Sequence, residues 1–228
     1  MINKKMDSTE NSEEKNGTID HDRRKTIKKI AVGIGLLTGS SVLPEKWIKP
    51  FIGQTVLPAH AQTSAAGRIV ALGDSIGARS PNWPSLVESK SGLNVANYSK
   101  DSLKTGDFVG RVASILDSNN PSHLMILLGT NNARSGSVSS AISDLRTMAR
   151  IGNEKNVIVI IGTLPPILTS SSANANAEKI SNGISGISNI RVAEVRSAMG
   201  SGSGLFNDGL HPNSKGTDII ANAFLKQI

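Results

Sequence analysis

Two short motifs contain side chains that could together perform acyl transfer. Gly73-Asp74-Ser75 directly follows the apolar stretch 68–72, so the Ser75 hydroxyl would lie at the end of a buried strand, where a nucleophile can meet its substrate. Asp208 precedes His211 by three residues. A carboxylate at this spacing can bond one ring nitrogen and leave the other free to accept the proton of a serine.

A third motif, Gly129-Thr130-Asn131-Asn132, follows another apolar stretch. The Asn131 side chain can donate a hydrogen bond to a developing oxyanion. Each motif also has an ordinary interpretation, because Gly-Asp-Ser is common in Asx-turns and helix caps and Asn often caps a helix. Outside residues 1–61 the only histidines are His123 and His211, and His123 begins a predicted strand at the opposite end from the catalytic side.

The elements that would position these side chains alternate between strands and helices from residue 67 onward. Short β-rich stretches bounded by Gly, Asn, Pro or Ser predict five strands, at 68–72, 94–97, 123–128, 156–161 and 189–194. Helices are predicted at 83–90, 106–117, 137–151, 173–187 and 214–226. Strands that are apolar at nearly every position indicate a parallel sheet covered on both faces, and hence an α/β sandwich with its ligand at the carboxyl ends of the strands.

The first 61 residues differ in composition from the rest of the chain. Residues 1–22 are polar and of mixed charge, which predicts disorder. Arg23-Arg24-Lys25 then precedes the apolar run 30–43, and Ala59-His60-Ala61 offers small residues for a signal peptidase. This order predicts an export signal that resembles a twin-arginine signal, followed by one domain at 62–228 in the periplasm or outside the cell.

Composition excludes several other functions. The net charge of +7 is scattered rather than clustered and only 3% of residues are aromatic, so a nucleic-acid interface is not expected. The 228 residues include no Cys, which excludes a disulfide scaffold and a thiolate site. Carboxylates do not cluster at metal-binding spacing, and no Gly-rich phosphate motif follows the first strand. We therefore expect neither a metal nor another cofactor.

Taken in order, the three motifs resemble those of the SGNH hydrolase superfamily, also called GDSL esterases and lipases. The resemblance covers about residues 67–228 and implies a three-layer α/β/α sandwich with a five-stranded parallel sheet, of the flavodoxin-like SGNH type. It implies a triad of Ser75, Asp208 and His211. It also implies an oxyanion hole that includes the Asn131 side chain and the backbone N–H of Ser75.

The sequence departs from the family pattern at one oxyanion position. The family has an Asn and then, a few residues later, a Gly whose N–H completes the oxyanion hole; in the stretch 97–106, Ser102 falls on that Gly without gaps. If the position requires a positive φ, Ser102 is strained there. Gly106 is the alternative donor if the loop carries an insertion. Asn132 stands where the family commonly has Asp, and we expect this change to alter loop hydrogen bonding more than chemistry.

The resemblance implies a serine esterase that cleaves carboxylic esters through an acyl-enzyme. The domain is compact and its strand-end loops are short, which favours small acyl groups such as O-acetyl, on a small ester, a glycan or a lipid. The alternative is a non-catalytic module that binds glycans or envelope components and retains the fold. Ser102 at the Gly position is its main support.

Overall fold

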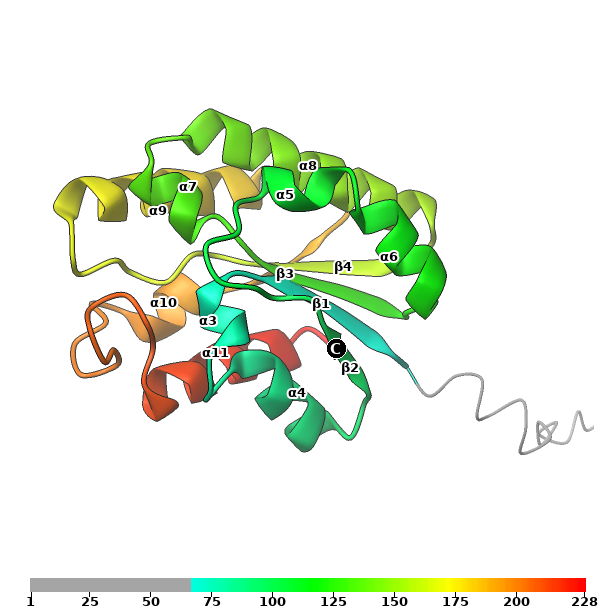
Figure 1. Cartoon of the computed structure of the whole chain (residues 1–228), viewed down its shortest axis with the longest axis horizontal. Helices are drawn as coiled ribbons and strands as arrows, with labels where there is room; N and C mark the ends of the chain where they lie inside the picture. The colour runs from blue at the N-terminus through cyan, green and yellow to red at the C-terminus, as the bar shows by residue number, and fades with distance from the viewer. Residues whose placement is uncertain (1–66) are drawn as a thin grey trace, which may run out of the picture. The chain divides into compact units, whose positions relative to one another are not determined.

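The computed structural model describes residues 67–228, and these form a sheet of five parallel strands in the order β2-β1-β3-β4-β5 (Figure 1). The strands are β1 (Ile69–Gly73), β2 (Val95–Asn97), β3 (His123–Leu127), β4 (Ile158–Gly162) and β5 (Arg191–Ala193). In the central pair, Ile69 lies opposite His123 and Gly73 opposite Leu127, so β1 and β3 end level with each other. The predicted parallel sheet is confirmed.

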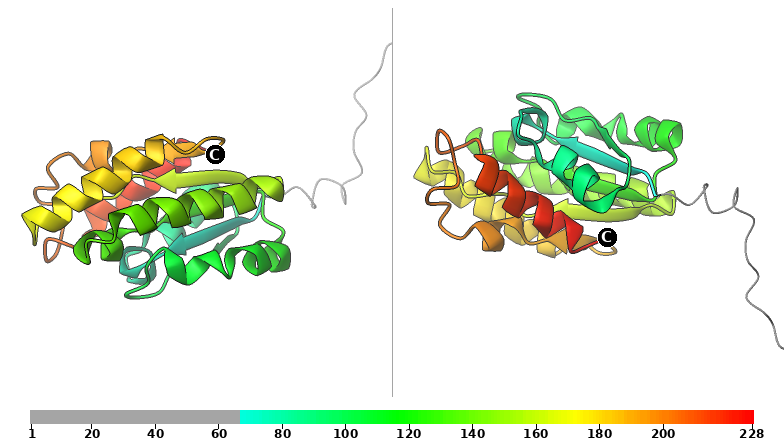
Figure 2. Two further views of the ribbon diagram at one scale, coloured as in Figure 1. Left: turned by 90° about the horizontal axis from the view of Figure 1, so that it is seen from above. Right: turned by 90° about the horizontal axis from the view of Figure 1, so that it is seen from below.

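Helices cover both faces of the sheet (Figures 1 and 2). They are α3 (Ser75–Ala78), α4 (Trp83–Ser91), α5 (Gly106–Val109), α6 (Val112–Asn119), α7 (Thr130–Arg134), α8 (Val138–Glu154), α9 (Ser171–Ser185), α10 (Val195–Met199) and α11 (Ser214–Leu225). One layer consists of α5 to α9 and the other of α3, α4, α10 and α11. The predicted three-layer α/β/α sandwich is therefore confirmed.

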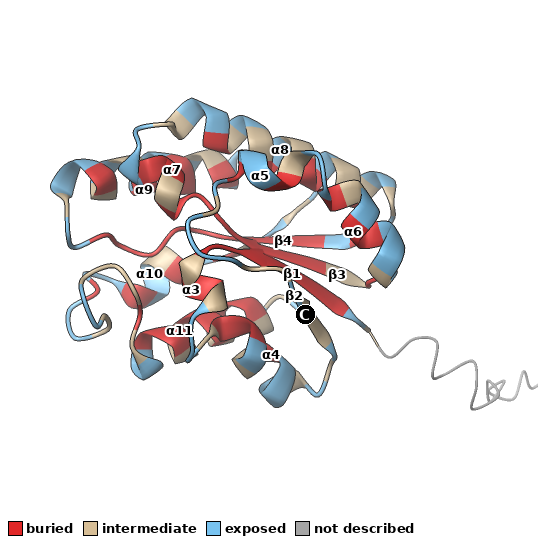
Figure 3. Ribbon diagram, in the orientation of Figure 1, coloured by how far each residue is buried: buried red, intermediate tan, exposed pale blue. Residues whose placement is uncertain are grey.

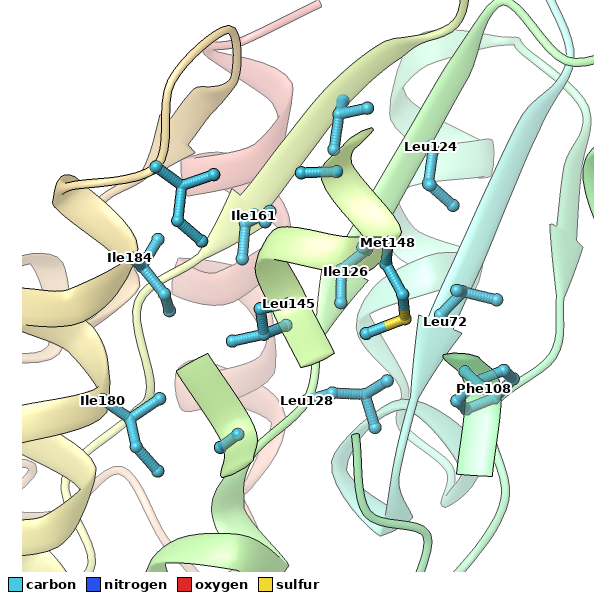
Figure 4. Close-up of a cluster of buried hydrophobic side chains, with 14 of the residues drawn as sticks. Leu72, Phe108, Leu124, Ile126, Leu128, Leu145, Met148, Ile161, Ile180 and Ile184 are labelled. Carbon is cyan, nitrogen blue, oxygen red and sulfur yellow. The ribbon is translucent and has the colours of Figure 1, made fainter. Parts of the chain in front are cut away.

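The core is divided between the two faces by the alternation of side chains along each strand. Val70 and Leu72 point into the cluster beneath α5 to α9, whereas Ile69 and Ala71 point toward the opposite helices. Burial on both faces explains why the central strands are apolar throughout, and Figure 3 shows them as almost continuously buried. Figure 4 shows the larger cluster, in which Phe108 packs among aliphatic side chains.

The longest helix, α8, forms over the stretch where helical spacing was clearest in the sequence. Leu145, Met148 and Ala149 are buried on the face toward the sheet. Ile142 is half-buried and packs against α9 at Gly183, where any Cβ would collide with the Ile142 side chain. The missing side chain at residue 183 thus permits close contact between the two helices.

The predicted helix at 106–117 is wrong in one respect, because the structure divides it into α5 and α6. The break lies at Gly110 and Arg111, and glycine is a poor helix former. Helices α3, α7 and α10 were not predicted. They contain only four or five residues each, too few to show a helical period.

The predicted export signal at residues 1–61, and the first residues of the domain predicted to begin at 62, lie outside the described residues and stay predictions. Between residues 67 and 228, none of the helices combines the length and the apolar character needed to span a membrane.

At the centre of the sheet, the connections that follow neighbouring strands run to opposite faces. After β1 the chain passes to α3 and α4 on one face, and after β3 it passes to α7 and α8 on the other. Parallel sheets bind ligands at such a point, beyond the carboxyl ends of the strands. Ser75 and Asn131, which follow β1 and β3, are therefore brought to the same edge.

Candidate active site

Ser75 is the first residue of α3 and is separated from the end of β1 by Asp74 alone. Asp74 caps this helix, because its Oδ1 accepts a hydrogen bond from the Ile76 backbone N–H at 3.0 Å. The turn is close-packed, since a Cβ at residue 73 would collide with the Ser99 hydroxyl. The Asx-turn interpretation is therefore correct for Asp74, and the same turn places the half-buried Ser75 at the sheet edge.

His211 and Asp208 lie against Ser75 in one chain of hydrogen-bonding groups. His211 Nε2 is 3.1 Å from Ser75 Oγ, and His211 Nδ1 is 2.6 Å from Asp208 Oδ2. Asp208 Oδ1 also accepts from the backbone N–H groups of His211, at 2.6 Å, and Leu210, at 2.9 Å. These bonds, above all the one from the imidazole, hold the pKa of Asp208 well below its usual range, so the carboxylate stays ionised beside the ring.

The loop that carries His211 is fixed by backbone hydrogen bonds. The Leu168 N–H, from the loop after β4, donates to Gly209 O at 2.8 Å, and the Asn207 N–H donates to His211 O at 2.9 Å. Gly209 has a φ of +80°, a conformation that suits glycine. Directly after the loop, Asn213 caps α11 by accepting from two backbone N–H groups. The Asp208–His211 segment is thus held at both ends.

Ser102 has a φ of +65° and lies in a turn closed by the Leu103 N–H, which donates to Lys100 O at 3.5 Å. Among residues 67–228 the other non-glycine residues with positive φ are all Asn, which tolerates this conformation far better than Ser. The cost for Ser is roughly 1–2 kcal/mol. Gly106 does not have a positive φ and instead begins α5. Ser102 therefore has the positive φ under which the sequence analysis expected it to be strained.

The side chains of Asn131 and Asn132 bond to the backbone of the loop that contains Ser102. The Asn131 Nδ2 group donates to Leu103 O at 3.0 Å, which uses one of its two N–H groups. Asn132 is buried, and its Oδ1 accepts from the Thr105 N–H at 3.1 Å. Asn132, which replaces the Asp common in the family, thus takes part in the hydrogen bonding of this loop, where the sequence analysis expected the replacement to act.

Comparison with known proteins agrees at the level of the fold. No protein-family model matches the chain, and no curated protein does either. Among solved structures, a member of the lipolytic G-D-S-L family from Veillonella parvula matches with a TM-score of 0.62 at 19% identity, over 70% of this chain and 96% of that one. The domain has the fold of the GDSL lipolytic proteins.

Two further GDSL-like structures give the same result. The lipase/acylhydrolase from Enterococcus faecalis has a TM-score of 0.63 at 24% identity, over 71% of this chain and 95% of that one. A catalytic mutant of an acetylxylan esterase from Geobacillus stearothermophilus has a TM-score of 0.60 at 16% identity, over 71% and 93%. The matched share of this chain is close to the share that residues 67–228 represent.

A cavity of about 190 Å³ opens beside Ser75. Its lining residues are Ser75, Ile76, Arg79, Ser80, Pro81, Asn207, Asp208, His211 and Pro212. It is smaller than the roughly 300–1,000 Å³ of sites for drug-sized ligands. The space adjoining Ser75 thus fits a small group.

Arg79, at the edge of this cavity, forms a two-pronged ion pair with Asp101. Its Nη2 lies 2.6 Å from Asp101 Oδ2, and its Nε lies 3.0 and 3.2 Å from the two carboxylate oxygens. By residue type alone, Arg79 is either a solvated surface charge or a cation for an anionic substrate. The pairing with Asp101 was missed, because nothing in the sequence links two charges 22 residues apart.

Asp74 differs from the other acidic residues of the site because it is buried. Its Oδ2 has no hydrogen-bond partner among the described residues. Burial raises the pKa of Asp74 to about 6, against the opposing effects of the Ile76 N–H, the Thr130 hydroxyl and the nearby His211. The residue before Ser75 is therefore a buried carboxyl with a raised pKa.

His123 lies away from these groups. It begins β3, at the opposite end of the strand from Asn131, and its Nδ1 is 2.8 Å from the Ser122 hydroxyl. Burial lowers its pKa. The prediction that His123 is a structural residue at a strand start agrees with this position. Between residues 67 and 228, no group of three or more His, Asp or Glu side chains is arranged to bind a metal ion.

Proposed function

We propose that the domain is a serine esterase that cleaves carboxylic esters through an acyl-enzyme. The observation that carries the proposal is the continuous contact from Asp208 through His211 to Ser75, at 2.6 and 3.1 Å. A hydroxyl, an imidazole and a carboxylate in this order form the arrangement that activates a serine for attack on a carbonyl.

In the first half of the reaction, His211 Nε2 removes the Ser75 proton while Oγ forms a bond to the ester carbonyl carbon. Asp208, kept ionised by its hydrogen bonds, orients the ring and stabilises the imidazolium. The tetrahedral intermediate then collapses. The bond to the alcohol oxygen breaks, and His211 returns the proton to the departing alcohol. Ser75 is left acylated.

In the second half, His211 removes a proton from water, and the resulting hydroxide attacks the acyl carbon. The bond to Ser75 Oγ breaks, His211 gives the proton back to Ser75, and the carboxylic acid leaves. In each half of the reaction, His211 accepts one proton and later donates one. The enzyme is thus restored.

Three donors form the oxyanion hole in this proposal. The Ser75 N–H lies at the first position of α3, where helix N–H groups lack intrahelical partners. The Asn131 amide keeps one N–H for substrate, because the other is bound to Leu103 O. The N–H of Ser102 completes the set, and the positive φ of Ser102, which favours glycine, supports its alignment with the glycine of the family pattern. Gly106 begins a helix after the turn and is the weaker choice.

We further propose that the substrate carries a short acyl group, such as O-acetyl. The cavity of about 190 Å³ has room for a small group and is lined largely by polar and charged residues. An acetylxylan esterase has the same fold. The export signal predicted for residues 1–61 would place such a substrate outside the cytoplasm, on a small ester, a glycan or a lipid.

Hydrolysis of p-nitrophenyl acetate by the full chain tests the proposal, with Ser75→Ala as the decisive variant. The expected result is turnover by the parent and a loss of at least about 10³-fold in kcat/KM for Ser75→Ala. Ser140→Ala, an exposed serine on α8, is the matched control and should retain the parent rate.

Equal rates in the parent and Ser75→Ala would remove the esterase proposal. They would favour the second candidate, a domain that binds an acylated glycan without turnover. That candidate has one specific observation in its support, the strained Ser102 at the oxyanion position. Binding of an acetylated oligosaccharide by both proteins, measured by calorimetry, would then identify it.

A further inference from the structure

The short helix that carries Ser75 and the turn that carries Ser102 are connected by a single ion pair. Arg79 caps the C-terminal end of α3, and its backbone N–H donates to Ser75 O at 3.0 Å. Its guanidinium binds both carboxylate oxygens of Asp101, the residue directly before Ser102. The Arg79 side chain therefore links the helix that begins at Ser75 to the turn that contains Ser102, two parts of the proposed oxyanion hole.

We infer that Arg79 is a positioning residue that holds the Asp101–Ser102 turn in register with Ser75. The inference rests on the proposed esterase function, because it assigns the purpose of the turn to oxyanion binding. Arg79 acts through Asp101 on the backbone of Ser102. It is not proposed to contact the reacting atoms.

The turn needs such support because its own contacts are weak. Ser102 is exposed and has a φ that disfavours serine. The two backbone hydrogen bonds at Lys100 are long, at 3.3 Å from its N–H to Gly73 O and 3.5 Å from the Leu103 N–H to its carbonyl. Asn131 holds the turn from one side through Leu103, and Arg79 holds it from the other.

The geometry of the pair suits positioning better than binding of an anionic substrate. Nε and Nη2 of Arg79 are both engaged by Asp101, so the positive charge is balanced within the protein. A planar guanidinium bound to a carboxylate through two atoms also fixes orientation, which a lysine ammonium does not. Arginine is therefore better suited than lysine to fixing the orientation of the Asp101 carboxylate.

The test measures hydrolysis of the neutral ester p-nitrophenyl acetate by full-chain variants. Arg79→Gln and Asp101→Asn should each lower kcat by about ten-fold or more with little change in KM, since the loss falls on the transition state. Their double variant should be no worse than either single one, because both remove the same contact. Arg79→Lys should fall between the parent and Arg79→Gln.

Arg150→Gln is the matched control, because Arg150 forms an equally exposed ion pair with Glu154 on α8, away from Ser75. It should keep the parent kcat. Ser102→Gly provides a rescue that a merely structural role would not show. Glycine adopts a positive φ without strain, so Arg79→Gln should lose several-fold less activity in the Ser102→Gly background than alone.

Three results would overturn the inference while leaving the proposed function intact: an active parent with an equally active Arg79→Gln, no rescue by Ser102→Gly, or an Asp101→Asn variant that is faster than the parent on an anionic ester. The last result would assign Arg79 to substrate binding. Failure of the proposed function looks different, since parent and Ser75→Ala would then hydrolyse the ester equally.

Discussion

Two aspartates belong to the surroundings of Ser75, and their environments shift their pKa values in opposite directions. Asp74 precedes Ser75 in the chain, is 1% exposed, and has one oxygen without a partner, so burial raises its pKa to about 6. Asp208 reaches Ser75 through His211, and its side chain is 53% exposed. Three hydrogen bonds, led by that of the imidazole, lower its pKa.

The difference shows that two kinds of support meet at this site. The end of β1 is held by close packing, and the tight turn that follows buries the Asp74 carboxyl. The Asp208–His211 loop is held by hydrogen bonds near solvent. Identical side chains therefore have different tasks, because hydrogen bonds favour the charged form and burial opposes it. Asp208 is suited to stabilising an imidazolium, and Asp74 to shaping the turn.

Replacing each aspartate by asparagine should separate these tasks most clearly in the rate. Asp208→Asn should lower kcat on p-nitrophenyl acetate by about 10³–10⁴-fold, because the amide favours the wrong ring tautomer and leaves the imidazolium without a counter-charge. Asp74→Asn should remain within about ten-fold of the parent, since its Oδ1 can still cap α3. Steady-state kinetics with circular dichroism as a folding control measure both.

A larger loss of rate in Asp74→Asn than in Asp208→Asn would reverse the assignment. It would mean that the buried carboxyl takes part in the chemistry and that the exposed one only shapes its loop.

Stability against pH should show the opposite ranking. The folded state binds a proton at Asp74 more tightly than the unfolded chain does, so this group stabilises the fold below about pH 4 and that contribution is lost as pH rises through about 6. Above that range the buried charge costs about 2–3 kcal/mol. Relative to the parent, Asp74→Asn should therefore gain by about this amount in unfolding free energy between pH 4 and pH 8, measured by urea denaturation.

Asp208→Asn is the control for this measurement, and its sign is the reverse. A lowered pKa stabilises the fold above about pH 4 and loses that contribution as pH falls. Because Asp208 is exposed, the effect should be small. Parallel stability curves for Asp74→Asn and the parent would contradict the assignment of a buried, destabilising charge to residue 74.

The smallest effect is expected at the turn that contains Ser102. Ser102→Gly should raise the unfolding free energy by up to about 1 kcal/mol, because glycine relieves the strain of a positive φ but loses more backbone entropy. Asn189→Gly, at another positive-φ position, should gain less, since Asn already tolerates this conformation. Thermal unfolding compares the two, and a greater gain at residue 189 would contradict the account of strain at Ser102.

The central strands and the longest helix could be predicted because buried elements consist of recognisable runs or periods of apolar residues. The central strands and the long helix α8 contain enough residues to show their period, and their side chains pack on the sheet as the pattern requires. The placement of Ser75 and Asn131 at one edge followed from their positions after two neighbouring parallel strands. Ser102 has a positive φ, which is the condition under which the sequence analysis expected strain at this residue.

Other features depend on contacts that leave no local pattern. The pairing of Arg79 with Asp101 joins two exposed charges, which in a sequence look like any solvated residues. The raised pKa of Asp74 arises from what surrounds it, and no neighbouring residue in the chain indicates that. The bonds from Asn131 and Asn132 to the loop before α5 also join residues 28 and 27 positions apart, which no local pattern records.

The central claim is that Ser75 is the nucleophile, and covalent capture tests it most directly. The full chain would be treated with an active-site-directed phosphonate, p-nitrophenyl ethylphosphonate, and analysed by intact mass and peptide mapping. The account predicts one adduct per chain, on Ser75, with labelling strongly slowed in His211→Ala. An adduct on another serine, or ester hydrolysis by a chain that acquires no adduct at Ser75, would contradict it.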